Sequence, residues 1–464
     1  MIHTIHLSTY TNYKAPFSEV SVILSQIKKH PLILGTALLT GAGLVSRILG
    51  FFYRIFLSHT IGASGLGLYQ LIFPVFGLCL ALSSSGIQTA ISRYVASAKQ
   101  PQLYLWCGML LSVFLAGTLA IFVYWLAPWI ATDILKEART TELLQLISLA
   151  LIPAAVHACF NGYYYGRKNS IPPAICQIME QLARVFGTLL MYQILQEQGK
   201  PLAPLHAVWG LVIGELAGLL VNITSYLVLR QPNTPAQPSA TMESVLSTII
   251  MPLKALGIMA IPLTLNHVLM TLSHSLEHLL LPQQLMLFGY TSDEALGHFG
   301  ILTGMALSVI FFPSAITNSL SVLLLPRISE TKSRGDICAV LDTIKGALCC
   351  GVALGSLCTF VFLFSADWFG NFVFHNPLAG FYIRILSILC PFMYTSSLLS
   401  SIVNGLGYAS LTLACNLTGC AIRILAIWIL VPVYGMYAYV VAMIVGAVVV
   451  TGELMIVVRR KCRV

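Results

Sequence analysis

Long apolar segments, each able to cross a membrane, are the feature that most constrains how this chain folds. A helix needs about 20 apolar residues to span the hydrocarbon core of a bilayer. Apolar residues make up 57% of the 464-residue chain and charged residues only 9%, whereas soluble domains carry about 25% charged residues. We therefore predict an all-α polytopic membrane protein. About twelve transmembrane helices are expected, at residues 31–58, 65–96, 104–130, 141–165, 171–195, 204–229, 245–281, 297–325, 337–365, 378–404, 409–431 and 435–458.

A polar stretch at residues 230–244 divides these segments into two halves, and the halves resemble each other. Residues 67–100 can be laid over 297–333, and residues 160–185 over 403–424. Six helices in a half give both halves the same orientation, so we expect two bundles related by a pseudo-two-fold axis along the membrane normal. The predicted organisation is a cytoplasmic tail (1–30), a first six-helix bundle (31–229), a cytoplasmic linker (230–244) and a second six-helix bundle with a basic tail (245–464).

The positions of lysine and arginine predict the orientation. With the N-terminus inside, most of the 25 lysines and arginines fall in cytoplasmic loops and tails, and the outer loops hold only Lys136, Arg139 and Lys200. Cytoplasmic loops of membrane proteins carry such an excess. The first 30 residues lack the apolar core and cleavage site of a signal peptide. We expect both termini to be cytoplasmic, and the net charge of +9 reflects this bias rather than nucleic-acid binding.

Two arginines lie within the first apolar segment, in the run SRILGFFYR. Arg47 and Arg54 are separated by close to two helical turns, so both side chains lie on one face of a helix. No acidic residue occurs between Glu19 and Asp133. A charge inside a bilayer normally faces a cavity or a partner, and a guanidinium group matches the geometry of phosphate. The two arginines therefore predict a site for a phosphate or pyrophosphate group. For Arg54 the alternative is snorkelling to the outer interface.

Four further intramembrane charges have different expected roles. Glu180 and Arg184 have the i, i+4 spacing of an intrahelical ion pair, and we expect a structural pair. Arg384 and Arg423 have no acidic residue within a helical turn. They are therefore the second half's candidate groups for binding the same anion.

A third set of residues consists of candidate proton or cation sites. Glu215 lies among glycines that we expect to pack against a neighbouring helix. The sequence HSLEH at 274–278 matches the H-x-x-E-H motif of zinc proteases. A catalytic zinc needs a third protein ligand, and His267 lies too far along the helix to share a metal with both other histidines. We therefore predict no metal site, and treat His267, His274 and Glu277 as candidates for proton or cation coupling. A plain interfacial helix end is the alternative.

No nucleotide-binding loop of the G-x-x-x-x-G-K-[ST] type occurs in the chain. We expect neither a cofactor nor an enzymatic activity. Transport driven by an ion gradient, by the membrane potential or by consumption of the product remains open.

Four stretches of the chain, at residues 46–96, 162–185, 299–330 and 400–424, resemble the stage V sporulation protein B family. That family belongs to the multidrug/oligosaccharidyl-lipid/polysaccharide (MOP) exporter superfamily, whose paired six-helix bundles agree with the repeat. The resemblance implies a role in spore cortex synthesis in a bacterial plasma membrane, by flipping a peptidoglycan precursor linked to undecaprenyl pyrophosphate. Related lipid II flippases carry a similar S-R-x-L-G-F-x-R stretch whose arginines line the central cavity. Arg47 matches that pattern, and Arg54 comes one residue later than the second arginine.

The first hypothesis is therefore a flippase for a lipid-linked oligosaccharide that works by alternating access, with possible coupling to H⁺ or Na⁺. The second is an ion-coupled multidrug exporter of the same superfamily. Such an exporter needs a carboxylate in its cavity, and the first three predicted helices contain none. The third is a non-transporting scaffold for cortex synthesis, for which Arg47 would be dispensable.

Overall fold

The computed structural model describes residues 31–98, 100–229, 242–334 and 336–462, and all regular structure in them is helical. The predicted tail and most of the predicted linker lie outside these residues. The α-helices are α2 (Pro31–Thr60), α3 (Gly62–Leu71), α4 (Phe73–Leu80), α5 (Gly86–Ser97), α6 (Pro101–Trp129), α7 (Thr141–Ser148), α8 (Leu151–Gly166), α9 (Ile171–Glu197), α10 (Pro204–Leu229), α11 (Met242–Phe288), α12 (Ser292–Gly300), α13 (Leu307–Phe311), α14 (Ser314–Ser333), α15 (Ile337–Trp368), α16 (Pro377–Leu386), α17 (Leu389–Gly405), α18 (Ala409–Ile429), α19 (Val431–Tyr434) and α20 (Met436–Cys462).

Each predicted transmembrane segment corresponds to one helix or to a run of consecutive helices. By length and composition, the described residues contain 9 helices able to cross a membrane, or up to 11 if each of two bent pairs is one span. The remaining predicted segment is α9, which is long enough at 27 residues. It is less apolar than those helices, because it carries Gln177, Glu180, Gln181 and Arg184. The prediction of about twelve helices is consistent with the structure.

The two halves break their helices at corresponding places, as the internal repeat predicts. The second helix of each half contains a π-helical turn, η1 (Ala81–Ser85) and η4 (Ile301–Ala306). The fourth helix of each half is bent, by 45° between α7 and α8 and by 54° between α16 and α17. Pro153 and Pro391 lie just after these bends. Proline removes a helical hydrogen bond and clashes with the preceding turn, which explains the bends.

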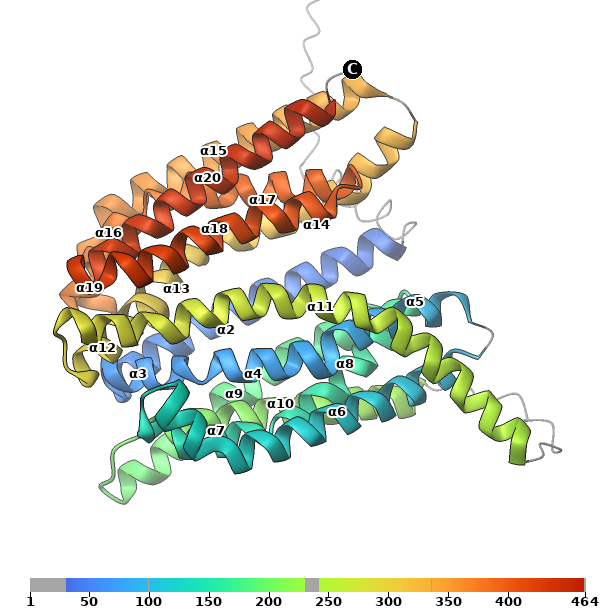
Figure 1. The fold of residues 1–464 in the computed structure, drawn as a ribbon, viewed down its shortest axis with the longest axis horizontal. Coiled ribbons are helices and arrows are strands. Elements are labelled where there is room, and N and C mark those ends of the chain that lie inside the picture. The colour runs from blue at the N-terminus through green and yellow to red at the C-terminus, as the bar shows by residue number, and fades with distance from the viewer. Residues whose placement is uncertain (1–30, 99, 230–241, 335, 463–464) are drawn as a thin grey trace, which may run out of the picture.

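The first half and the second half lie one above the other in Figure 1, with α2 and α11 between them. They pack most closely at the end where α3 and α12 lie side by side. A Cβ atom at Gly67 would lie 2.1 Å from the carbonyl oxygen of Leu296, and one at Gly300 would lie 2.2 Å from that of Ala63. Only glycine permits so close a crossing at these two positions.

Polar contacts join the halves near the same end. Arg139 lies 2.7 Å from both Glu137 and Asp293, and the hydroxyl groups of Ser64 and Ser292 donate to Asp293 and Glu137, at 3.1 and 2.5 Å. The guanidinium group of Arg139 donates to Glu137 and lowers the pKa of that carboxyl group. Because the pKa is lowered, Glu137 holds its charge, and with it this contact, at neutral pH.

Helix α11 contacts both halves. Near its start, Leu256 and Ala260 belong to a buried cluster with residues of α5, α6 and α8. Further along, Glu277 bonds to Arg423 in α18. The first part of α11 packs with the first half, so packing alone does not mark a boundary at residue 245. The predicted division there stays a prediction.

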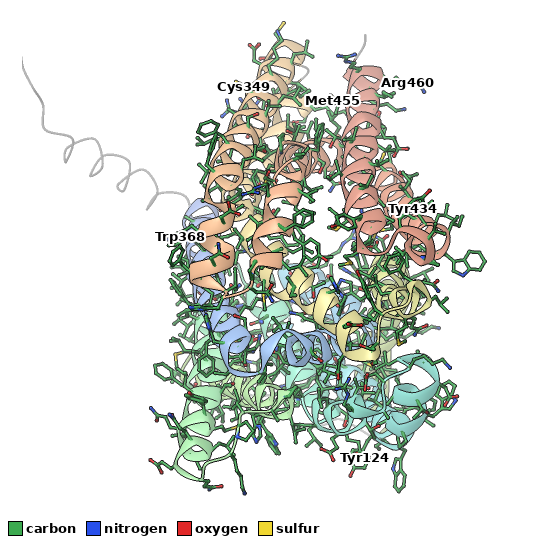
Figure 2. The ribbon with its side chains drawn as sticks, turned by 90° about the vertical axis from the view of Figure 1, so that its left-hand side faces the viewer. Tyr124, Cys349, Trp368, Tyr434, Met455 and Arg460 are labelled. Atoms are coloured by element: carbon green, nitrogen blue, oxygen red, sulfur yellow. The ribbon has the colours of Figure 1, made fainter. Side chains whose placement is uncertain are left out.

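Large apolar side chains cover the outside of the molecule, as a surface facing lipid requires. Tyr124, Trp368 and Tyr434 lie at its periphery, and 45%, 55% and 62% of each is exposed (Figure 2). The fold therefore has the exterior of a membrane protein and keeps most of its polar contacts within and between the bundles.

Candidate functional site

A cavity of about 430 Å³ lies between the two halves. The first half contributes α2 and α9, and the second half contributes the segment around α13 and the start of α14. Both predicted anion-binding arginines of the first segment line it. The lining residues are Gly43, Ser46, Arg47, Gly50, Phe51, Arg54, Gln177, Gln181, Ser308, Phe311, Phe312 and Ser314.

Each of the two arginines reaches across the cavity to a hydroxyl group of the other half. Arg47 Nη1 donates to Ser314 Oγ at 3.0 Å, and Arg54 Nη1 donates to Ser308 Oγ at 2.7 Å. With its amide oxygen turned inward, Asn318 also accepts from Arg47 Nη2 at 2.6 Å. In the described part of the chain, neither arginine has a carboxylate oxygen within 4.0 Å.

This arrangement can bind an anion. Two guanidinium groups lie on one helix face, and within the described ranges both donate only to neutral oxygen atoms. Their positive charge is therefore not cancelled locally, and an incoming phosphate oxygen would be a stronger acceptor than a serine hydroxyl. Gln177 and Gln181, four residues apart on α9, add amide donors to the same cavity. The alternative of snorkelling for Arg54 is not supported, because its side chain points across the cavity to Ser308.

Arg384 and Arg423, predicted to bind the same anion from the second half, lie apart from this cavity. Arg384 is paired with Asp367, and Arg423 donates to both carboxylate oxygens of Glu277, at 2.8 and 2.9 Å. Both acidic partners lie on other helices, so a search within one helical turn could not find them. Their charges are compensated, which makes them poor groups for an anion.

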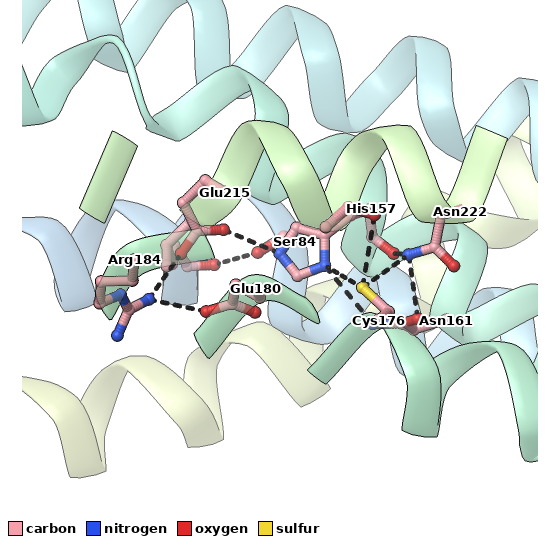
Figure 3. Close-up of polar contacts among 10 residues, drawn as sticks. Ser84, His157, Asn161, Cys176, Glu180, Arg184, Glu215 and Asn222 are labelled. Carbon is pink, nitrogen blue, oxygen red and sulfur yellow. Dashed lines mark hydrogen bonds and ion pairs between the residues drawn. The ribbon is translucent and has the colours of Figure 1, made fainter. Parts of the chain in front are cut away.

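The predicted ion pair between Glu180 and Arg184 is present, with an N–O distance of 2.7 Å. It belongs to a larger buried cluster between α8, α9 and α10 (Figure 3). Arg184 also lies 3.7 Å from Glu215, and Glu215 lies 3.0 Å from His157 Nε2. Sequence reasoning missed His157. Nothing in its spacing along the chain connects it to Glu215, which lies on another helix.

The candidates of the HSLEH region do not gather into one site. His267 is exposed, while His274 Nδ1 lies 3.9 Å from Glu277. His274, Glu277 and Cys420 have ligand atoms close enough together to hold a metal ion. However, Arg423 already occupies both oxygens of Glu277, so the carboxylate is compensated without a metal.

Comparison with known proteins gives the family. The polysaccharide biosynthesis protein family matches residues 32–332. Over 432 residues the chain is 26% identical to stage V sporulation protein B of Bacillus subtilis (strain 168). This alignment covers 91% of this chain and 82% of that relative. The resemblance seen in the sequence is thereby confirmed.

Two solved structures show the fold. The lipid II flippase MurJ, in an inward closed conformation, superposes with a TM-score of 0.67 and 16% identity, covering 91% of this chain and 87% of that chain. An inward-facing multidrug resistance transporter of the MATE family, MOP superfamily, superposes with a TM-score of 0.63 and 14% identity. That superposition covers 91% of this chain and 94% of the transporter. The chain therefore belongs to the polysaccharide biosynthesis protein family and is a multi-pass membrane protein with the fold of the MOP superfamily.

Proposed function

We propose that this protein flips a lipid-linked glycan precursor across the bacterial plasma membrane by alternating access. The substrate would be an undecaprenyl-pyrophosphate-linked peptidoglycan precursor of the lipid II type, used in spore cortex synthesis. The observation that carries the proposal is the pair of arginines, Arg47 and Arg54, in a cavity between two repeated bundles, with no carboxylate beside either one among the described residues. A pyrophosphate group offers the anionic oxygens that this cavity can bind.

The position of the arginines supports binding that changes as the halves move. Both lie on α2 in the first half, and their serine partners lie in the second half. Separation of the halves breaks these hydrogen bonds and frees the guanidinium donors for the substrate. Rocking of one bundle against the other is the general mechanism of such repeat transporters. The names of the similar proteins, a sporulation protein and a lipid II flippase, support the substrate class.

An exporter of cationic drugs is the second candidate, and the cavity does not favour it. Such a substrate needs a negative group, and the described residues that line the cavity include no aspartate or glutamate. The same observation leaves the arginines free to attract an anion.

Flipping of fluorescent lipid II in proteoliposomes tests the proposal. We expect the wild-type protein to flip it and Arg47→Ala to lower the rate about tenfold or more, because a charge-assisted hydrogen bond contributes about 1.5–3 kcal/mol. Arg47→Lys should be intermediate, since lysine keeps the charge but loses the planar fork. The matched control is Arg327→Ala, which removes an exposed arginine of α14 away from the cavity.

Two outcomes would contradict parts of the proposal. Equal rates for wild type and a folded Arg47→Ala variant would remove this arginine from the binding site. Absence of flipping by the wild type, with lipid II and with another undecaprenyl-pyrophosphate-linked glycan, would exclude the flippase and favour drug export or a scaffold.

A further inference from the structure

The buried cluster of the first half contains an unbalanced set of charges. Its ionisable groups are Glu180 and Arg184 on α9, Glu215 on α10 and His157 on α8. Their side chains are at most 21% exposed, and that of Glu215 is only 7% exposed. Two carboxylates and one arginine leave a net charge of −1 if the histidine is neutral. An uncompensated charge in such a place is strongly destabilising.

The geometry indicates where the missing positive charge resides. Among the described residues Glu215 Oε2 accepts no hydrogen bond, and His157 Nε2 lies 3.0 Å from it, within the distance of an ion pair. The other ring nitrogen, Nδ1, lies 3.5 Å from Asn161 Nδ2 and 3.9 Å from Cys176 Sγ. A proton on Nδ1, which would then donate to Cys176 Sγ instead of accepting from the Asn161 amide, would turn His157 into an imidazolium beside Glu215. The net charge of the cluster would then be zero.

A metal ion fits the same groups less well. Ligand atoms of His157, Glu180 and Glu215 lie within 4.8 Å of one another. Arg184, however, lies 2.7 Å from Glu180 and 3.7 Å from Glu215. A fixed guanidinium group at that distance repels a second cation and uses one of the carboxylate oxygens. A proton needs only the short contact between histidine and glutamate that is present.

The second half provides a comparison within the same molecule. There Glu277 is compensated by Arg423 alone, so the pair is neutral without His274. His274 is also far more exposed than His157, at 56% against 16%. The two halves are repeats, yet among the described residues Arg423 has no second carboxylate within 4.0 Å, whereas Arg184 has two.

The cluster lies beside the arginine-lined cavity. Helix α9 turns Gln177 and Gln181 to the cavity and Cys176, Glu180 and Arg184 to the cluster. Other titratable or charged groups near it are Tyr53 and Tyr69, whose neutral phenol groups lie near Arg184, and Tyr165, which lies near Cys176. Arg54 of the cavity also acts on Arg184 through its charge. A change in the charge of the cluster therefore takes place one helix away from the proposed anion site.

We propose that this cluster is a proton-binding site, in which His157 carries the proton that compensates Glu180 and Glu215 in the conformation described. Release of that proton would leave a buried negative charge and favour rearrangement of α8, α9 and α10. The inference does not depend on the flipped substrate, because it concerns the charge state of the resting protein.

The protonation state can be measured directly by ¹⁵N magnetic resonance of histidine-labelled protein in nanodiscs. Comparison with His157→Gln assigns its signal, and His274→Gln serves as the matched control in the second half. We expect both ring nitrogens of His157 to be protonated at about pH 7.5, a full unit above the ordinary pKa of histidine. The signal of His274 should be that of a neutral imidazole.

Two charge-removing variants make the test independent of any one of them folding. Either Glu180→Gln or Glu215→Gln removes the excess negative charge, so His157 should become neutral at the same pH in each. A neutral His157 in the wild type would overturn the proposal. A signal that shifts when Na⁺ replaces K⁺ at constant pH would assign the site to a metal cation and would also overturn it. Neither result bears on whether the protein flips lipid II.

Discussion

At the scale of the residue, the arginines within the membrane-spanning helices differ in the partners that they meet. Arg423 donates two hydrogen bonds to the carboxylate of Glu277, and Arg184 donates one to the carboxylate of Glu180. Among the described residues, the hydrogen-bond partners of Arg47 and Arg54 are neutral oxygens only. Because a carboxylate cancels the charge of a guanidinium group and a hydroxyl does not, the first two form ion pairs and the last two fit the proposed anion site.

The pair of Glu277 and Arg423 gives a prediction about stability. Glu277→Gln leaves a buried arginine without its counter-charge, which costs about 3–5 kcal/mol in comparable sites. We expect a clear fall in the thermal unfolding temperature in detergent. The control is Glu330→Gln, which breaks an exposed pair with Arg334 and should cost about 1 kcal/mol or less. Similar effects for both variants would mean that Glu277 is not the structural partner described.

At the scale of the element, the crossing of α3 and α12 joins the halves. Gly67 and Gly300 bring the two backbones together where no side chain fits. The contacts of Arg139, Glu137 and Asp293 lie near the same end. This end is the closed one in the structure, so opening it requires the two helices to separate.

A pair of glycines on α12 tests the crossing. Gly300→Ala places a methyl group 2.2 Å from a backbone oxygen of α3, whereas Gly297 has no atom within 4 Å of the corresponding position. We expect Gly300→Ala to destabilise the packing by about 1–3 kcal/mol, as overpacked sites do, and Gly297→Ala to have little effect. Hydrogen–deuterium exchange should become faster in α3 and α12 in the first variant. Unchanged exchange would show that these helices do not touch so closely.

At the scale of the whole molecule, α2 begins and α20 ends at the same end of the molecule (Figure 1), and the last turn of α20 carries Arg459, Arg460 and Lys461. Lys332 and Lys461 both lie over the ring of Tyr408 there, 5.1 and 4.7 Å from its centroid. The opposite end carries α3, α12 and the loop between α9 and α10. This distribution supports the proposed orientation, with both termini in the cytoplasm.

Reporter fusions test that orientation. Alkaline phosphatase folds only outside the cytoplasm, so we expect activity when it is inserted after Lys200, between α9 and α10, and none when it follows Val464. Green fluorescent protein should give the reverse pattern. Phosphatase activity at the C-terminus would invert the proposed topology, and with it the direction of transport.

The amino-acid sequence by itself determined the class and the helices, and it predicted the two arginines of the candidate site. Apolar length predicts a spanning helix because a bilayer leaves the backbone no other partner, and the distance between Arg47 and Arg54 places them on one face. The Glu180–Arg184 pair follows from the same local geometry. The tertiary structure alone decided what each charge meets. Carboxylates on other helices compensate Arg384 and Arg423, which were expected to bind an anion, and Glu215 lies beside His157. The period of a helix places neighbours along one helix, while the partners that cancel a buried charge come from whichever helices pack against it.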